Sequence, residues 1–250
     1  MTGGIPRGVL VSTFLRSFLI QGSWNYHTML GGGFAFALLP GLRRLFGGDE
    51  QAMHASLERH IEHFNAHPYM STLALGAALR MEAEGTDADT VRRFKAAVRG
   101  PLGGLGDALV WATWLPSVSV AGLALLWLGV PGWVAALAFL ILYNVGHLWL
   151  RVWAFRTGLR EGRDVGRRLG RTDLLGWATR LRPVTALLVG LLAGALLAGP
   201  GGLAEAGPLW AALAAAAFLG GLLAGHHAWR PAAIAVVGVV AALAAWGLGA

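Results

Sequence analysis

Five long stretches of almost uninterrupted apolar residues constrain this chain more than any other feature. They run over residues 109–128, 133–150, 183–199, 208–225 and 231–249. A helix needs roughly 20 apolar residues to cross the hydrocarbon core of a bilayer. The sequence therefore predicts an all-α, polytopic integral membrane protein with about five long transmembrane helices.

Composition supports lipid as the solvent. Only 13% of the residues are charged, whereas soluble domains carry about a quarter. The 37 glycines fit the same interpretation, because small residues let helices approach closely inside a membrane. The chain has no cysteine, which excludes disulfides, thiolate metal sites and a cysteine nucleophile.

The positions of the basic residues predict the orientation in the membrane. Of the 20 Lys and Arg residues, nine fall in 151–182 and five in 80–99, whereas 129–132 and 200–207 contain none. Short basic loops stay in the cytoplasm. This asymmetry explains the net charge of +7 as topology, so we expect no nucleic-acid partner.

The chain divides near residue 100. We expect short, broken, re-entrant or interfacial helices in 1–100, with cytoplasmic amphipathic helices at 48–64 and 89–98. Residues 101–250 are expected to form a transmembrane helical region with a cytoplasmic Arg-rich loop at 151–182. The first apolar run lacks a small-residue cleavage site, so we expect no removable signal peptide.

A polar and aromatic cluster lies between apolar segments near the N-terminus. Buried polar groups at membrane depth need partners, so they tend to line a substrate path or join helices. Amides can bond sugar hydroxyls, and an aromatic ring can stack on a pyranose. An aromatic belt at the interface is the equal alternative. The cluster reads Gln21-Gly22-Ser23-Trp24-Asn25-Tyr26.

Three histidines are spaced as if to share one helical face. His60, His63 and His67 stand at i, i+3 and i+7. The order differs from the His-Glu-x-x-His of zinc proteases, and Pro68 disfavours a helix at His67. A solvated polar helix that ends in a structured turn is one interpretation. The rival is a membrane metal-dependent enzyme that uses His60, Glu62 and His63.

A glycine-rich segment precedes the first long apolar stretch, and it ends in an acidic residue. The segment lacks the Gly-Lys-Ser or Gly-Lys-Thr of a nucleotide-binding loop. Asp107 could accept hydrogen bonds from a sugar, or it could cap the following helix. The segment reads Gly100-Pro101-Leu102-Gly103-Gly104-Leu105-Gly106-Asp107.

Three polar residues are spaced along the second long apolar stretch. Asn144, His147 and Arg151 stand at i, i+3 and i+7 and so share a helical face. They face the protein interior on one interpretation. On the other, Arg151 extends toward the membrane surface and has no special role.

Together these motifs resemble the IID component of the mannose/fructose/sorbose family phosphotransferase system. The matching segments are 21–26, 64–69, 100–107 and the triplet Asn144, His147 and Arg151, in the family's order. The resemblance covers nearly the whole chain. It implies a bacterial cytoplasmic (inner) membrane, multi-pass subunit that pairs with a IIC subunit to form a path for hexose uptake. IIA and IIB proteins would carry the phosphate in this hetero-oligomer.

The resemblance also implies site residues. It places Trp24, Asn25, Asn65, His67 and Asp107 near the sugar path. It implies no catalytic residue, metal or cofactor in this subunit. The remaining motif positions are expected to be structural: Gln21, Gly22, Ser23, Tyr26, Pro68, Gly103, Gly106, Asn144, His147 and Arg151.

The chain departs from the family's pattern at several positions. His27 and Thr28 replace an acidic and a basic residue, and Leu115 replaces the arginine that usually precedes the proline at 116. The alternative is therefore a degenerate regulatory IID-like membrane protein without transport.

Overall fold

The computed structural model describes residues 4–181 together with Thr185 and Val189, and in them we find helices and no strand. The predicted all-α class is confirmed for this part of the chain. The predicted spans 208–225 and 231–249, and nearly all of 183–199, lie outside it. The helices are α1 (Arg7–Arg16), η1 (Ser17–Leu19), α2 (Gly31–Phe46), α3 (Glu50–Ile61), α4 (Ser71–Ala83), α5 (Ala88–Gly106), η2 (Asp107–Trp114), α6 (Leu115–Trp127), α7 (Gly132–Glu161), η3 (Gly162–Asp164) and α8 (Val165–Gly170), followed by helical residues 174–181.

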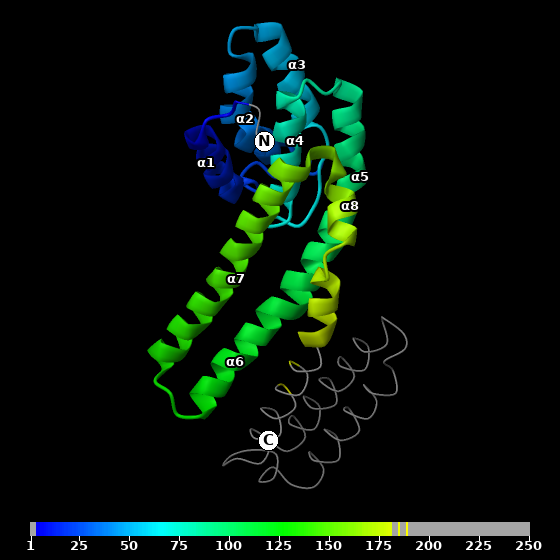
Figure 1. The fold of residues 1–250 in the computed structure, drawn as a ribbon. Coiled ribbons are helices and arrows are strands. Elements are labelled where there is room, and N and C mark those ends of the chain that lie inside the picture. The colour runs from blue at the N-terminus through cyan, green and yellow to red at the C-terminus, as the bar shows by residue number, and fades with distance from the viewer. Residues whose placement is uncertain (1–3, 182–184, 186–188, 190–250) are drawn as a thin grey trace, which may run out of the picture. The chain divides into compact units, whose positions relative to one another are not determined.

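Two long helices form an antiparallel hairpin (Figure 1). The first runs without a break from α5 through η2 into α6, and the second begins at Gly132. Gly129 makes the turn between them with φ 81°, a conformation that glycine adopts without strain. Both helices are long and apolar enough to cross a membrane.

Two boundaries drawn from the sequence fall within helices. The division at residue 100 falls inside α5, and residues 151–161 of the expected Arg-rich loop continue α7 as helix. Arginine is a good helix former, so a basic segment need not be a loop. The helix also passes Pro101, which membrane helices tolerate where neighbouring groups satisfy the freed carbonyl.

Helix α4 forms the centre of the bundle at the other end of the hairpin. It packs against α7, α2 and α5, and Leu73 and Leu75 are fully buried. At its crossing with α7, a Cβ on Gly158 would strike the backbone of Leu73, and one on Gly76 would strike the backbone of Phe155. The two backbones therefore touch because both positions are glycine.

A buried charge network joins α3, α4 and α5. The Arg59 guanidinium donates two hydrogen bonds of 2.7 Å to the Glu82 carboxylate, and the Nε2 of His60 lies 2.8 Å from it. The Nζ of Lys95 donates to the carbonyl oxygens of Arg59 and His60. Burial would raise the pKa of Glu82, but the hydrogen bonds from His60 and Arg59 lower it to about 2.

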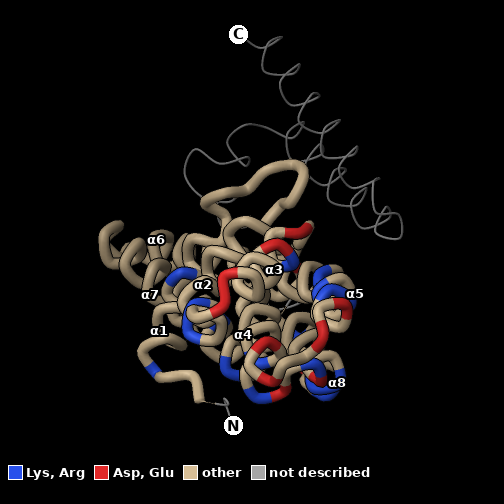
Figure 2. The backbone as a smooth tube through the Cα atoms, turned by 90° about the horizontal axis from the view of Figure 1, so that it is seen from above, with Lys and Arg blue, Asp and Glu red and all other residues tan. Residues whose placement is uncertain are grey.

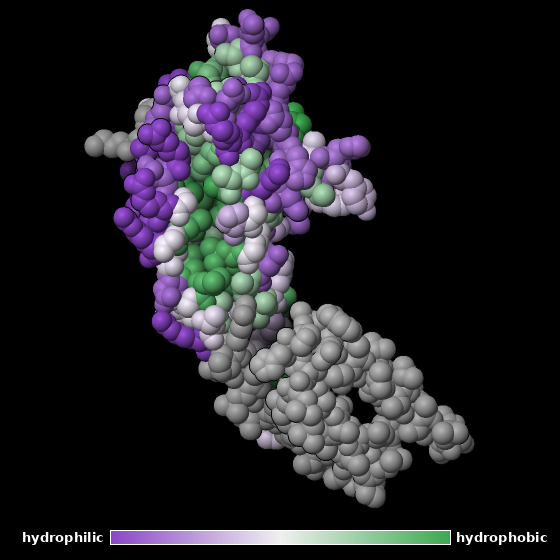
Figure 3. Space-filling view, turned by 90° about the vertical axis from the view of Figure 1, so that its right-hand side faces the viewer, coloured by the Kyte–Doolittle hydropathy of each residue, from purple (hydrophilic) through white to green (hydrophobic). Residues whose placement is uncertain are grey.

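The surface of the hairpin is apolar. Residues 108–150 contain no Asp, Glu, Lys or Arg, and Leu140, Ile141 and Trp133 are among its exposed side chains. Seen from above, the charged residues gather on α2, α3, α5 and α8 (Figure 2). A second view shows apolar surface exposed beside the hydrophilic end (Figure 3). Exposed apolar helices of this length need lipid or protein against them.

Candidate functional site

Asn25 organises the turn between η1 and α2. Its Oδ1 accepts hydrogen bonds from the backbone N–H groups of His27 and Thr28, at 3.0 and 2.9 Å. Its Nδ2 donates to the Ser23 carbonyl at 3.1 Å and to the Thr28 hydroxyl at 2.8 Å. Met29 follows with φ 53°, and its N–H donates to the Asn25 carbonyl at 2.9 Å. Asn25 therefore shapes the loop through its own side chain.

This turn is joined to the segment between α3 and α4. The N–H of Leu30 donates to the Phe64 carbonyl at 2.8 Å, and the N–H of Phe64 donates to the Thr28 carbonyl at 3.2 Å. The Phe64 ring is fully buried, which fixes the backbone on either side of it. The polar residues Trp24 and Asn65 are thereby brought to one region.

The end of α5 is the third segment that lies in this region. Gly106 lies against His67, because a Cβ at Gly106 would overlap the imidazole. The next residue, Asp107, opens the π-helix η2. Asp107 is itself helical (φ −62°, ψ −44°), and no side-chain cap begins η2. The capping interpretation of Asp107 is therefore wrong, because the helix does not start there.

These three segments enclose a pocket of ≈ 400 Å³. Cavities of this size accommodate small organic ligands. Of the five residues predicted near the sugar path, Asn25 alone is absent from the lining, since its side chain is used in the turn. The lining consists of Gln21, Trp24, Leu30, Asn65, Ala66, His67, Pro68, Arg99, Gly100, Gly103, Gly104 and Asp107.

His67 is neutral in this setting. Burial lowers its pKa to about 4, and the positive charge of Arg151 and the nearby His147 act in the same direction. Its Nδ1 accepts the backbone N–H of Tyr69 at 3.2 Å, so the proton is on Nε2. That Nε2 is buried and has no hydrogen-bond partner among the described residues. A neutral donor is therefore held at the pocket wall.

The pocket carries one cation and one anion. Asp107 and Arg99 both line it, and Arg99 also lies 2.8 Å from the Nδ1 of His63 through its Nη1. Sequence reasoning missed Arg99. Its position directly before the glycine-rich segment was the available signal, but its charge was assigned to membrane topology. A carboxylate and a guanidinium together can accept and donate hydrogen bonds to hydroxyl groups.

Arg151 is buried beside this site and does not extend toward the membrane surface. Its Nε donates to the Nε2 of His147 at 2.8 Å, and its Nη1 donates to the Ser17 carbonyl at 3.1 Å. The guanidinium lies 4.7 Å from the ring centre of Tyr69 and 4.6 Å from that of Phe18. Aromatic faces stabilise the cation in place of a carboxylate.

Of the motif residues expected to be structural, Gln21, Pro68 and Gly103 line the pocket, whereas several others lie elsewhere. Asn144 is exposed and donates to the Leu140 carbonyl at 2.8 Å, so it does not join His147 and Arg151 in the interior. Tyr26 is 82% exposed, with its ring 4.9 Å from that of Trp24. The N–H of Gly22 donates to the Leu19 carbonyl, and Ser23 packs against Gly32.

The histidines of the rival metal site diverge. Helix α3 ends at Ile61, so His60 turns inward to Glu82 whereas His63 faces Arg99. Within the described residues, no group of three or more His, Cys, Asp or Glu side chains is placed to hold a metal ion. The i, i+3, i+7 spacing places the three histidines on one face only if the helix is continuous, and α3 ends before His63.

Comparison with known proteins gives a family match over residues 5–198, to the "PTS system mannose/fructose/sorbose family IID component". The mannose-specific EIID component of Escherichia coli (strain K12) is 34% identical over 162 residues, which are 63% of this chain and 56% of that protein. The sorbose-specific EIID component of Klebsiella pneumoniae is 32% identical over 166 residues, 64% of this chain and 60% of that protein. The matched region thus spans little more than half the length of these relatives.

Solved structures show the same fold. A chain in the cryo-EM structure of the mannose transporter ManYZ with microcin E492 aligns with a TM-score of 0.60 and 25% identity, covering 99% of this chain and 98% of that one. A second structure, described as a membrane protein, aligns with a TM-score of 0.68 and 29% identity over 76% of this chain and 71% of its own. The chain is thus a membrane protein.

Proposed function

This chain belongs to the IID components of the mannose/fructose/sorbose phosphotransferase family, and on that premise we propose that it is a membrane subunit for hexose uptake. It forms the sugar path with a IIC subunit, and a IIB protein phosphorylates the sugar, with IIA supplying the phosphate. It spans the bacterial inner membrane with about five helices and contributes no catalytic residue of its own.

The observation that carries this proposal is the convergence of three distant segments on one pocket. Gln21 and Trp24, Asn65 and His67, and Asp107 line the same ≈ 400 Å³ space. Amide, carboxylate and guanidinium groups match sugar hydroxyls in hydrogen bonding. The Trp24 ring supplies an apolar face for the ring of the sugar. Asn25 acts as a positioning residue that shapes the turn carrying Trp24.

Uptake measurements test the proposal. In a strain that lacks its own IID but supplies matching IIA, IIB and IIC, Asp107→Asn and Trp24→Ala should each lower hexose uptake about tenfold, the loss of roughly 1.4 kcal/mol of binding or transition-state stabilisation. Matched controls are Asp89→Asn, in an exposed ion pair with Arg92, and Trp133→Ala, exposed on the hairpin. The controls should stay within about twofold.

The same strain separates the alternatives. A regulatory IID-like protein would co-purify with IIC and support no uptake, even without substitutions. Parental uptake in both pocket variants would refute the site. Stoichiometric zinc or iron in the purified protein would support the metal-enzyme rival, whose histidines the structure separates.

A further inference from the structure

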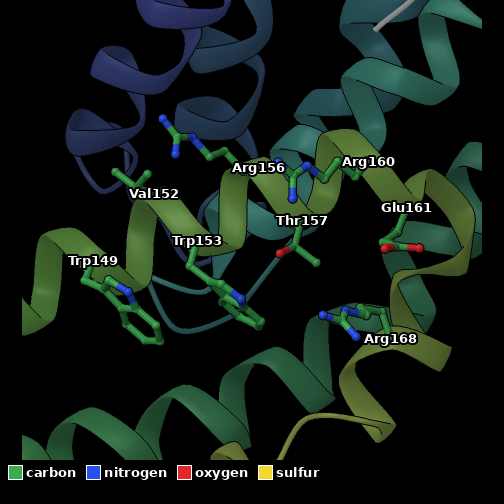
Figure 4. A pocket seen from close by; sticks show the side chains of 8 residues that line it. All are labelled: Trp149, Val152, Trp153, Arg156, Thr157, Arg160, Glu161 and Arg168. Carbon is green, nitrogen blue, oxygen red and sulfur yellow. The ribbon is translucent and has the colours of Figure 1, made fainter. Parts of the chain in front are cut away.

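A second pocket, of ≈ 280 Å³, lies at the charged end of α7. Trp149, Trp153, Thr157 and Arg160 line it from successive turns of α7, and Arg168 reaches in from α8 (Figure 4). Arg156 also lines it, with its side chain directed away from Arg168 (Figure 4), and Glu161 is its single acidic residue. The pocket begins where the uncharged stretch of the hairpin ends.

Three arginines of this pocket have no bonded partner among the described residues. The guanidinium groups of Arg156, Arg160 and Arg168 make no hydrogen bond or ion pair with any described residue, whereas the neighbouring Arg167 pairs with Asp164. The hydroxyl of Thr157 is likewise without a partner in the described part of the chain. Three arginines against the one carboxylate of Glu161 leave an excess of positive charge at this pocket, which a bound anion would neutralise. The positive-inside rule accounts for basic residues at this end of α7, but it does not require that they line a pocket.

An apolar cavity of ≈ 530 Å³ adjoins this pocket, and Trp149 lines both. Its walls come from α7, η2 and residues 174–181, and Trp114, Leu150 and Trp177 are among them. Thr113 and His147 are the two residues with polar side chains other than tryptophan in its lining. The Trp149 side chain thus lies between a polar pocket and an apolar cavity.

We propose that this pocket and the adjoining cavity together bind an anionic phospholipid. The phosphate lies among Arg160, Arg168 and the Thr157 hydroxyl, with Arg156 also in the lining, and an acyl chain occupies the cavity beside Trp149. Arginine forks match phosphate oxygens, tryptophan lies at the level of lipid headgroups, and basic pockets at the cytoplasmic ends of membrane helices take anionic headgroups. The adjoining apolar cavity favours a lipid over a soluble phosphate ester.

The binding test uses the purified full chain in nonionic detergent. Brominated phosphatidylglycerol is titrated in, and quenching of tryptophan fluorescence is followed. The triple variant R156Q/R160Q/R168Q should need about tenfold more lipid for half-saturation. The matched control R163Q/R167Q/R171Q removes the same charge from the same segment without touching the pocket, and it should shift by less than about twofold.

Three results would overturn the proposal. The pocket triple variant binds the lipid like the parent; both triple variants weaken equally, which indicates general attraction; or soluble glycerol phosphate displaces the lipid, which indicates that phosphate alone is recognised. Brominated phosphatidylcholine should quench far less than phosphatidylglycerol, and equal quenching also contradicts the proposal.

A second readout tests the position of the acyl chain and does not depend on the arginine variants. Trp149→Phe should remove part of the quenching amplitude, because Trp149 lines the cavity. Trp133→Phe is the control, since Trp133 is exposed near the tip of the hairpin. If the control loses amplitude and Trp149→Phe does not, the acyl chain lies elsewhere.

Discussion

Glu82 is the carboxylate that Arg59 and His60 share in the buried charge network. Its side chain is 2% exposed and holds Arg59 in a two-pronged ion pair. We predict that Glu82→Gln destabilises the protein by about 3–5 kcal/mol, because a buried guanidinium then lacks its counter-charge. Denaturant unfolding in detergent, followed by circular dichroism, measures this loss.

The control for this prediction is Glu84→Gln on the same helix end. Glu84 pairs with Arg80 at 2.7 Å, but its side chain is 50% exposed. Exposed pairs contribute about 0–1 kcal/mol. Equal losses in the two variants would show that burial does not set the strength of the Glu82 pair.

Because His60 is buried, we predict that the folded state loses stability in acid. Burial lowers its pKa from 6.5 to about 4, against the opposing hydrogen bond to Glu82. Between pH 6.5 and pH 4 the unfolded chain therefore binds a proton that the folded chain does not, so stability falls as pH falls. His60→Gln should reduce this slope by about 1.4 kcal/mol per pH unit. Unfolding at several pH values tests it, and His54→Gln, an exposed histidine, should leave the slope unchanged.

At this scale the residue types of the pocket could be predicted, but their individual roles could not. Polar residues beside apolar runs indicated Trp24 and Asp107, and the family resemblance indicated Asn65. The fold brings all three into one lining. Asn25 belongs to the same polar cluster as Trp24, yet its side chain forms its hydrogen bonds within its own turn. For Arg151 the sequence left an interior and a surface position open, because its aromatic partners come from distant segments. Such contacts depend on tertiary structure.

The crossing of α4 and α7 depends on two glycines. We predict that Gly158→Ala destabilises the protein by about 1–3 kcal/mol, because its methyl group would overlap the α4 backbone near Leu73. Thermal unfolding measures the change. Gly166→Ala is the control, since Gly166 lies in α8 with open space around it, and alanine there should be neutral or slightly stabilising. A loss confined to the control would contradict the crossing.

At the scale of elements, apolar length predicted helices but not their ends. The stretches 109–128 and 133–150 are parts of much longer helices. Each helix continues into charged sequence, where hydropathy gives no signal but helix propensity persists. The π-helix η2 was also missed, because an extra residue per turn leaves no mark in composition. Short, broken, re-entrant or interfacial helices were expected in residues 1–100, but α4 in that region is a buried core helix.

At the scale of the molecule, charge asymmetry predicts the orientation. Because the chain has no cysteine, a single cysteine can report each side of the membrane. Val130→Cys, at the hairpin tip, should react with an impermeant maleimide added to intact spheroplasts. Arg163→Cys, at the charged end, should react only after the membrane is opened. The reverse pattern would invert the proposed topology.

The uncharged hairpin also bears on how the protein is made. Residues 108–150 contain no Asp, Glu, Lys or Arg that would have to enter the hydrocarbon, and the turn at the tip of the hairpin is only a few residues long. As the nascent chain leaves the ribosome, α6 and α7 can therefore enter the bilayer as a pair. The arginines that follow then keep the carboxyl end of α7 on the cytoplasmic side. One segment of the chain thus inserts into the bilayer, and the next segment anchors it.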